Sequence, residues 1–310
     1  MAMNINIHVT VSSNSKRYFD YVRESYIGLC SNSSRLRFYA YCLDGQSYRA
    51  FSQNEGGGCQ AIPMEFGRGS MGHAKSIDTA ITNLVADEIN IISDTDIVML
   101  RNGWDLLLDD LLLKPSSYGI VGVPYETVGG FSSGNGDFQT YKRIPTATWM
   151  ALSPRYDFSR LTVIPDKENC IDVASIELSS IFNLPIGSRL LKDVGWQIPL
   201  YLHEHKIPYL AFEIIKPGSP ESKALKGCNP YHDEFQFGGQ PLIAHQRGSM
   251  KHRFRIDPLS VDFYDACDRY LNQPSWTVFP TTQDRIRAFG QDIVGMIKRP
   301  LRALRDKVSP

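Results

Sequence analysis

The chain has 310 residues, of which 42% are hydrophobic, so it can build a packed core as one large domain or two small ones. Its 33 basic and 33 acidic residues balance, which gives no reason to expect a nucleic-acid partner. The six cysteines are scattered without a CxxC pair, which argues against a zinc ribbon or a disulfide framework and favours reduced thiols in a cytoplasmic protein.

The first half of the chain alternates between strand and helix patterns. Ile5, Ile7, Val9 and Val11 alternate with other residues over 4–11, which predicts a strand. Further strands are expected over 36–44, within 90–100 and over 118–124, and helices over 15–30, 72–87 and 104–113. This βαβα order predicts an α/β fold with a mostly parallel sheet flanked by helices.

The second half is less regular. A glycine-rich loop is expected over 129–138, strands over 146–153 and 207–215, and a helix over 193–206. From about residue 274 the chain becomes basic and amphipathic. We therefore predict one domain over 1–273, followed by a helical C-terminal tail over 274–310.

Two carboxylates interrupt the strand pattern within 90–100. Asp94 and Asp96 flank Thr95, and side chains two residues apart in an extended segment point the same way. Two such charges repel each other unless a cation or a substrate group lies between them. Ligands of open α/β sheets gather at the carboxyl ends of strands, where a carboxylate pair suits a hard divalent cation. A plain surface turn after the strand is the alternative.

The segment HAKSIDTAITNLVADEINIISDTDIVMLRNGWD, residues 73–105, resembles the GT-A glycosyltransferases, which transfer a sugar from a nucleotide-diphosphate sugar. The resemblance extends to about Phe254 and implies a GT-A-like, Rossmann-like sheet. It also implies that Asp96 coordinates Mn²⁺ or Mg²⁺ on the donor diphosphate. In this family pattern Asp94 helps to hold the metal or contacts the ribose, and Thr95 belongs to the donor site.

The resemblance assigns further residues to the donor. The loop Thr10, Val11 and Ser12 would meet the nucleoside, and Asp44 would contact the base or ribose. His73 and Ser76 are expected to open a helix whose N-terminus could help to hold the donor. Ordinary helix capping is the alternative for His73 and Ser76, and a turn before Gly45 is the alternative for Asp44.

Two later segments complete the pattern. LLKDVGWQIPLYLHEH, residues 190–205, resembles the stretch that supplies a catalytic base, here Asp193 at an expected helix start. A helix N-cap is the alternative, and Lys192 occupies a position that is usually acidic. PLIAHQRGSMKHRFR, residues 241–255, resembles the element in which a histidine binds the metal. The resemblance implies that His245 is a metal ligand and that Arg247 and Ser249 contact the diphosphate. A structural histidine is the alternative for His245.

The basic C-terminal segment indicates possible partners of the protein. A basic amphipathic helix over 274–310 would suit peripheral contact with the inner face of a membrane and a lipid-linked acceptor. A helix docked on the protein's own surface, or an oligomer contact, explains the pattern equally well. The first residues lack the apolar core of a signal peptide, and no apolar run reaches the ~18 residues that span a bilayer.

The sequence therefore predicts a metal-dependent, inverting glycosyltransferase that acts on a glycan or lipid-linked acceptor. A haloacid-dehalogenase-type phosphatase also uses a D-x-D motif, but usually on its first strand and followed by Gly-Thr, where this chain has Ile97-Val98. A nucleotidyltransferase should carry a glycine-rich loop after its first strand, and residues 10–19 contain no glycine. A non-catalytic nucleotide-sugar or glycan-binding module is the third alternative.

Overall fold

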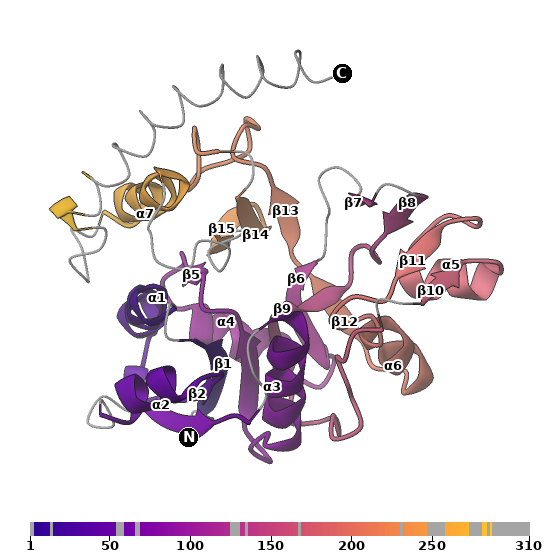
Figure 1. Cartoon of the computed structure of the whole chain (residues 1–310), viewed down its shortest axis with the longest axis horizontal. Helices are drawn as coiled ribbons and strands as arrows, with labels where there is room; N and C mark the ends of the chain where they lie inside the picture. Colours follow the sequence, from indigo (N-terminus) through magenta and orange to yellow (C-terminus); the bar gives the residue numbers. More distant parts are fainter. Residues whose placement is uncertain are drawn as a thin grey trace, which may run out of the picture.

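The computed structural model describes residues 3–12, 15–53, 59–65, 69–124, 131–133, 136–166, 169–229, 232–246, 258–272, 281–283 and 286. A seven-stranded sheet in the order β12-β6-β9-β4-β1-β2-β3 forms its centre (Figure 1). The strands are β1 (Ile5–Val11), β2 (Leu36–Cys42), β3 (Cys59–Pro63), β4 (Ile89–Ser93), β6 (Ile120–Pro124), β9 (Pro145–Leu152) and β12 (Tyr209–Ala211). Only β9 runs against its neighbours, so the predicted α/β fold with a mostly parallel sheet is confirmed.

Helices cover both faces of this sheet. On one face α1 (Lys16–Leu29) and α4 (Trp104–Leu112) share a hydrophobic cluster with the alternating isoleucines of β1. On the other face α3 (Ser70–Thr82) and α6 (Ile198–Glu204) share a second cluster with Ile92 and Met150. Every residue of β1 and β4 is buried, as expected for strands that lie between two helical layers. The helix α2 (Gly45–Ser52) was not predicted.

A second sheet, in the order β13-β14-β15-β5, divides two strands that the sequence predicted as continuous. It contains β5 (Ile97–Met99), β13 (Glu213–Ile215), β14 (Asp233–Phe237) and β15 (Gln240–His245). The predicted 90–100 strand breaks at residues 94–96, and the 207–215 strand breaks at Phe212, so that each crosses from the central sheet to this one. The helix α7 (Pro258–Leu271) packs into the same cluster as α1.

A third sheet, in the order β10-β11-β8-β7, lies beside α5 (Ile176–Phe182) at one end of the molecule (Figure 1). Its strands are β7 (Phe131–Ser133), β8 (Gly136–Gln139), β10 (Cys170–Asp172) and β11 (Arg189–Leu191). The expected glycine-rich loop over 129–138 therefore contains two short strands, and its other residues lie outside the described part of the chain. Strands of three or four residues are not recognised from the sequence, because they are too short to show an alternation of apolar and polar residues.

Three helix boundaries differ from those predicted. The helix predicted over 72–87 begins at Ser70 and ends at Thr82, because the Asn90 side chain bonds both the N–H and the carbonyl of Val85 at 3.0 Å and fixes a turn there. The helix predicted over 193–206 begins only at Ile198, since Gly195 has φ of +81°.

The predicted tail over 274–310 lies outside the described part of the chain, apart from residues 281–283 and 286. In the part of the chain that the structure describes, no helix combines the length and hydrophobicity that crossing a bilayer requires.

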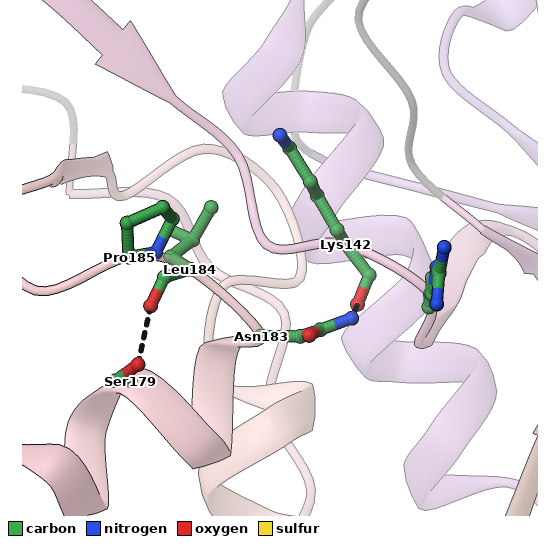
Figure 2. Close-up of a pocket in the computed structure, with 6 residues that line it drawn as sticks. Lys142, Ser179, Asn183, Leu184 and Pro185 are labelled. Atoms are coloured by element: carbon green, nitrogen blue, oxygen red, sulfur yellow. Dashed lines mark hydrogen bonds between the residues drawn. The ribbon is translucent and has the colours of Figure 1, made fainter.

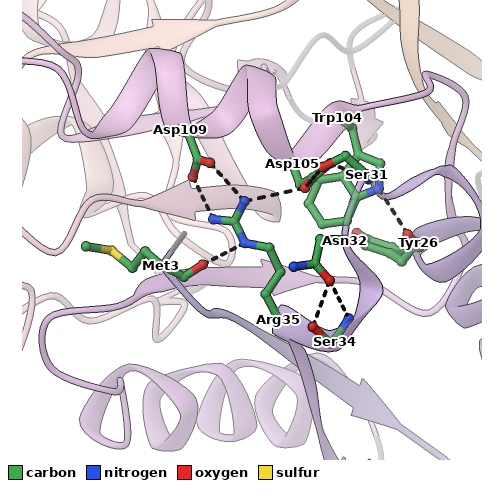
Figure 3. A network of polar contacts seen from close by, with 9 residues as sticks. All are labelled: Met3, Tyr26, Ser31, Asn32, Ser34, Arg35, Trp104, Asp105 and Asp109. Atoms are coloured by element: carbon green, nitrogen blue, oxygen red, sulfur yellow. Dashed lines mark hydrogen bonds and ion pairs between the residues drawn. The ribbon is translucent and has the colours of Figure 1, made fainter. Parts of the chain in front are cut away.

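A buried ion network ties α4 to the segment that follows α1 (Figure 3). The Arg35 guanidinium, 3% exposed, donates to both carboxylate oxygens of Asp109 at 2.7 and 2.8 Å and to the Met3 carbonyl at 2.6 Å. It also lies 3.4 Å from the fully buried Asp105 carboxylate. Burial raises the pKa of Asp105, but hydrogen bonds from Ser31 outweigh this effect and lower it.

Replacing Arg35 with methionine should destabilise the fold by about 3 kcal/mol, because a buried charge loses its partner. Arg37→Met is the matched control. Its guanidinium is 52% exposed and pairs with Glu88 at 3.2 Å, so its loss should cost less than about 1 kcal/mol. Urea unfolding of the two variants measures the difference, and equal losses would contradict the proposed role of the buried network.

His8 provides a pH-dependent contribution in the core. Its Nδ1 lies 3.1 Å from the Tyr41 hydroxyl and its Nε2 lies 3.1 Å from Asn90 Oδ1, while its ring stacks on Tyr39. The Asn90 oxygen can only accept, so Nε2 carries the proton and Nδ1 accepts from Tyr41. Burial lowers the pKa of His8 from 6.5 to about 4, and the hydrogen bond to Asn90 opposes this shift only in part.

The unfolded chain therefore binds a proton at His8 between about pH 6.5 and pH 4 while the folded chain does not, so stability falls as pH falls. Acidification from pH 7 to pH 4.5 should remove about 2 to 3 kcal/mol through His8 alone. Urea unfolding at the two pH values should show that the free energy of unfolding of His8→Gln falls by about 2 to 3 kcal/mol less than that of the wild type. A variant with the wild-type pH dependence would refute the assignment.

Candidate metal and donor site

The two aspartates lie where the central sheet meets the second sheet. Asp94 follows β4 directly, and its N–H donates to the Thr148 carbonyl of β9 at 2.9 Å. Asp96 precedes β5, and its carbonyl accepts from the Gln246 N–H at 3.1 Å. Thr95 and Asp96 are buried. The prediction that these residues end a buried strand is correct, although they form a turn between two strands rather than one extended segment.

Pairing of β15 with β5 brings a histidine to this turn. The two strands are antiparallel with His245 opposite Ile97, so the imidazole lies beside the adjacent Asp96. Its Nε2 is 3.6 Å from Asp96 Oδ1. One donor atom each from Asp94, Asp96 and His245 lies within 4.8 Å of the other two. The structure therefore brings together the three residues that the sequence assigned to a metal.

The chemistry of this donor set fits a divalent cation. Two carboxylates and an imidazole supply the oxygen and nitrogen ligands that first-row metals accept. Ligand atoms around one ion lie about 3 to 4 Å apart, so small side-chain rotations would close the cluster around it. These three residues could thus hold a metal ion and leave its remaining positions to a ligand.

A fully buried aspartate behind His245 was not predicted. Asp233 on β14 is opposite His245 in the strand register, and its Oδ2 lies 3.9 Å from His245 Nδ1. Its other carboxylate oxygen accepts from the Lys216 ammonium. A carboxylate on one imidazole nitrogen favours the tautomer and orientation in which the other nitrogen binds metal. No sequence signal indicates this role, because it depends on the β14–β15 register.

His73 lies on the other side of the acidic pair. Its Nε2 is 3.3 Å from Asp94 Oδ1, and both side chains are partly buried. Enclosure raises the pKa of Asp94 to about 7. Burial lowers the pKa of His73, and the negative charges of Asp96 and Asp193 act against this shift. His73 therefore lies beside Asp94 and within the electrostatic influence of Asp96 and Asp193.

The prediction that His73 and Ser76 lie at the start of a helix is wrong. Gly69, with φ of +104°, starts the helix at Ser70, so His73 and Ser76 lie one and two turns inside it. The Ser76 hydroxyl donates to the His73 carbonyl at 2.7 Å and lies 2.6 Å from Thr10 Oγ1. Both hydroxyls are buried, so this contact packs α3 against the end of β1.

The other predicted donor residues lie at the carboxyl ends of β1 and β2. The Val11 side chain is in the core and its carbonyl accepts from the Leu43 N–H at 2.9 Å, while Ser12 exchanges hydrogen bonds with Ser15. Asp44 is the N-cap of α2 in a reciprocal capping box with Ser47, where a turn before Gly45 was the alternative to a donor contact. Arg247 and Ser249 lie outside the described residues.

Asp193 is not the helix cap that its sequence allowed. It lies in the turn after β11, and Gln197 is the N-cap of α6. Its Oδ1 accepts from the Val194 N–H at 2.9 Å. The preceding Lys192 pairs with Asp166 at 3.2 Å and lies over the Trp196 ring, so its charge has another partner. The negative charge of Asp193 acts on His73, whose pKa it raises against the effect of burial.

No family model and no curated protein matches this sequence. Solved structures with a similar fold include glycosyltransferases. Mannosyltransferase PcManGT from Pyrobaculum calidifontis, in complex with GDP-Man and Mn²⁺, is 13% identical over 63% of this chain and 55% of its own, with a TM-score of 0.36. GlyE of Streptococcus pneumoniae TIGR4 is 14% identical over 87% of this chain and 63% of its own, with a TM-score of 0.42.

TarS of S. aureus, residues 1–349, is 11% identical over 93% of this chain and 79% of its own, with a TM-score of 0.37. This chain covers less than two thirds of the length of PcManGT and of GlyE. At these identities and TM-scores the likeness transfers no role to any residue, and the chemistry rests on the geometry described above.

Replacing Asp233 with asparagine should weaken Mn²⁺ binding about 10- to 100-fold, because His245 loses the carboxylate that orients it. Titration of free Mn²⁺ by electron paramagnetic resonance measures the affinity without reference to turnover. Asp172→Asn is the matched control, since that carboxylate also pairs with a cation, Arg189 at 3.2 Å, but is 76% exposed and faces no metal ligand. Equal Mn²⁺ affinity in both variants, with both folded by circular dichroism, would refute the role of Asp233.

Proposed function

We propose that this chain is a glycosyltransferase of the GT-A type, which moves a sugar from a nucleotide-diphosphate sugar to an acceptor hydroxyl. The observation that carries the proposal is the cluster of Asp94, Asp96 and His245 at the carboxyl end of a central strand. The resemblance of residues 73–105, which include Asp94 and Asp96, to that family supports the same conclusion.

Asp94, Asp96 and His245 would hold the divalent ion. An imidazole donor favours Mn²⁺ over Mg²⁺, which prefers oxygen ligands and retains several waters. When bound, the ion supplies positive charge that stabilises the departing diphosphate. The chain's own contribution is to fix two carboxylates and one imidazole in a partly buried turn, where electrostatic interactions are stronger than in water.

Asp193 would act as the general base. In an inverting reaction its carboxylate takes the proton of the acceptor hydroxyl while that oxygen attacks the anomeric carbon. Its effect on His73 supports a location beside the donor, and the Val194 N–H that bonds Oδ1 would hold the carboxylate in place.

The donor would lie along the carboxyl ends of β1, β2 and β4. We assign the backbone of Thr10, Val11 and Ser12, together with Asp44, to the nucleoside. Thr95 lies between the two aspartates, His73 lies beside Asp94, and Ser76 contacts Thr10 at the end of β1, so we assign all three to the donor site. Arg247 and Ser249 are assigned to the diphosphate. The acceptor is proposed to be a glycan or a lipid-linked glycan, with membrane contact through the tail over 274–310 at the inner membrane face.

Asp96→Ala should abolish sugar transfer and lower Mn²⁺ affinity, because it removes one of the three metal ligands. It should leave the fold intact, because the carboxylate belongs to the turn between β4 and β5 and not to the hydrophobic core. Asp193→Asn should retain donor binding and lose turnover by a factor of about 10² to 10⁴. Asp110→Ala, an exposed carboxylate on α4, is the control that should behave as wild type. Normal turnover of Asp193→Asn would place the base elsewhere, and full activity of Asp96→Ala would remove the metal from the mechanism.

The donor can be found by thermal stabilisation with a panel of nucleotide sugars, with and without Mn²⁺, because a ligand that binds the native state raises its melting temperature. Release of nucleotide from the donor identified in this way establishes turnover. Metal-dependent binding with no turnover toward any acceptor or water would identify a non-catalytic binding module. Hydrolysis of simple phosphate esters in place of sugar transfer would identify a phosphatase.

A further inference from the structure

A hollow of about 470 Å³ lies beside the C-terminal end of α5 and shares no residue with the acidic cluster (Figure 2). It is open to solvent and is lined by two cationic, two polar and two apolar residues. These are Lys142, Arg143, Ser179, Asn183, Leu184 and Pro185. Among the described residues, no carboxylate lines it. Its lining therefore carries positive charge alone.

Capping of α5 does not account for these cations, because the carbonyls at the helix end already have donors. The Asn183 N–H donates to the Ser179 carbonyl, and the Lys142 N–H donates to the Phe182 carbonyl at 3.1 Å. The Ser179 hydroxyl donates to the Leu184 carbonyl at 2.6 Å (Figure 2). The ammonium and guanidinium groups are thus left over after the helix end is satisfied.

The described part of the chain provides no counter-ion for either cation. Within the described residues, the side chains of Lys142 and Arg143 form no ion pair or hydrogen bond. Two like charges on neighbouring residues repel each other, and an anion between them relieves that repulsion. The planar guanidinium matches the oxygen geometry of a phosphate, and an adjacent ammonium adds a second charge-assisted contact.

The backbone at Arg143 has an unfavourable, left-handed conformation. Arg143 has φ of +56°, a region that residues with side chains rarely adopt. The Asn183 side-chain amide donates to the Lys142 carbonyl at 3.2 Å and thereby fastens this segment to α5 (Figure 2). Conformations of this kind persist where the surrounding structure holds them, and they concentrate at ligand sites.

We propose that this hollow is a binding site for a phosphate group, held by the Lys142 ammonium and the Arg143 guanidinium. Lys142 lies three residues before β9, and Thr148 of β9 accepts the hydrogen bond of Asp94. Lys142 and Thr148 are six positions apart in the chain, so their Cα atoms lie at most about 22 Å apart, a distance that one extended ligand could bridge. The phosphate site itself does not depend on the proposed transferase activity.

Titration of the full chain with inorganic phosphate, without metal or donor, tests the proposal. Nuclear magnetic resonance should show saturable shifts of the Arg143 Nε–H signal. Lys142→Gln/Arg143→Gln should weaken phosphate binding at least about tenfold. Lys206→Gln/Lys226→Gln removes the same charge from exposed residues outside the hollow, and Lys206 shares the positive φ of Arg143. This control should stay within about twofold of wild type.

Asp96→Ala should leave phosphate binding at the hollow unchanged, which separates this site from the donor site. A parallel titration with glycerol 3-phosphate distinguishes the source of the group. Binding at least as tight as inorganic phosphate means that the hollow takes phosphate esters, and much weaker binding means that it takes the free anion. Equal weakening in the two double variants, or no saturable shift at Arg143, would overturn the proposal. A phosphate-binding chain without sugar transfer would refute only the proposed function.

Discussion

The pairing of β15 with β5 is the interaction on which the candidate site depends. It joins the second sheet to the turn that leaves β4, and its register places His245 beside Asp96. A shift by one residue would turn the imidazole to the opposite face of the strand. The backbone bond from Gln246 to the Asp96 carbonyl extends this pairing past the end of β5 and holds the turn itself. The geometry of the cluster is therefore set by sheet registry and not by loop packing.

Charge then determines what this geometry can do. Asp94 and Asp96 are held close together, and burial raises the pKa of Asp94 to about 7. Such an arrangement costs free energy in the apo protein, and a cation between the carboxylates recovers it. His73 and Asp233 contribute from opposite sides, one beside Asp94 and the other behind His245. Carboxylates and imidazoles, all partly or fully buried, thus surround the place where a metal would lie.

The positive hollow beside α5 complements this negative site. The two lie near opposite ends of the segment that runs from Lys142 into β9 of the central sheet. One site offers carboxylates for a cation and the other offers cations for an oxyanion. The buried network of Arg35 with Asp105 and Asp109 shows how this chain treats a cation whose role is structural, with full pairing and almost no exposure. Lys142 and Arg143 have neither property.

The sequence by itself determined the central sheet, its main helices and the acidic pair, because alternating and helical periodicities are local properties of the chain. It also indicated His245 and Asp193 through a family resemblance. Only the tertiary structure decided that β9 runs antiparallel, that two predicted strands each divide between sheets, and that Asp193 precedes α6 without capping it. It alone revealed Asp233, whose role comes from facing His245 across β14 and β15. Contacts between residues distant in sequence depend on strand order and register, and no local pattern encodes those.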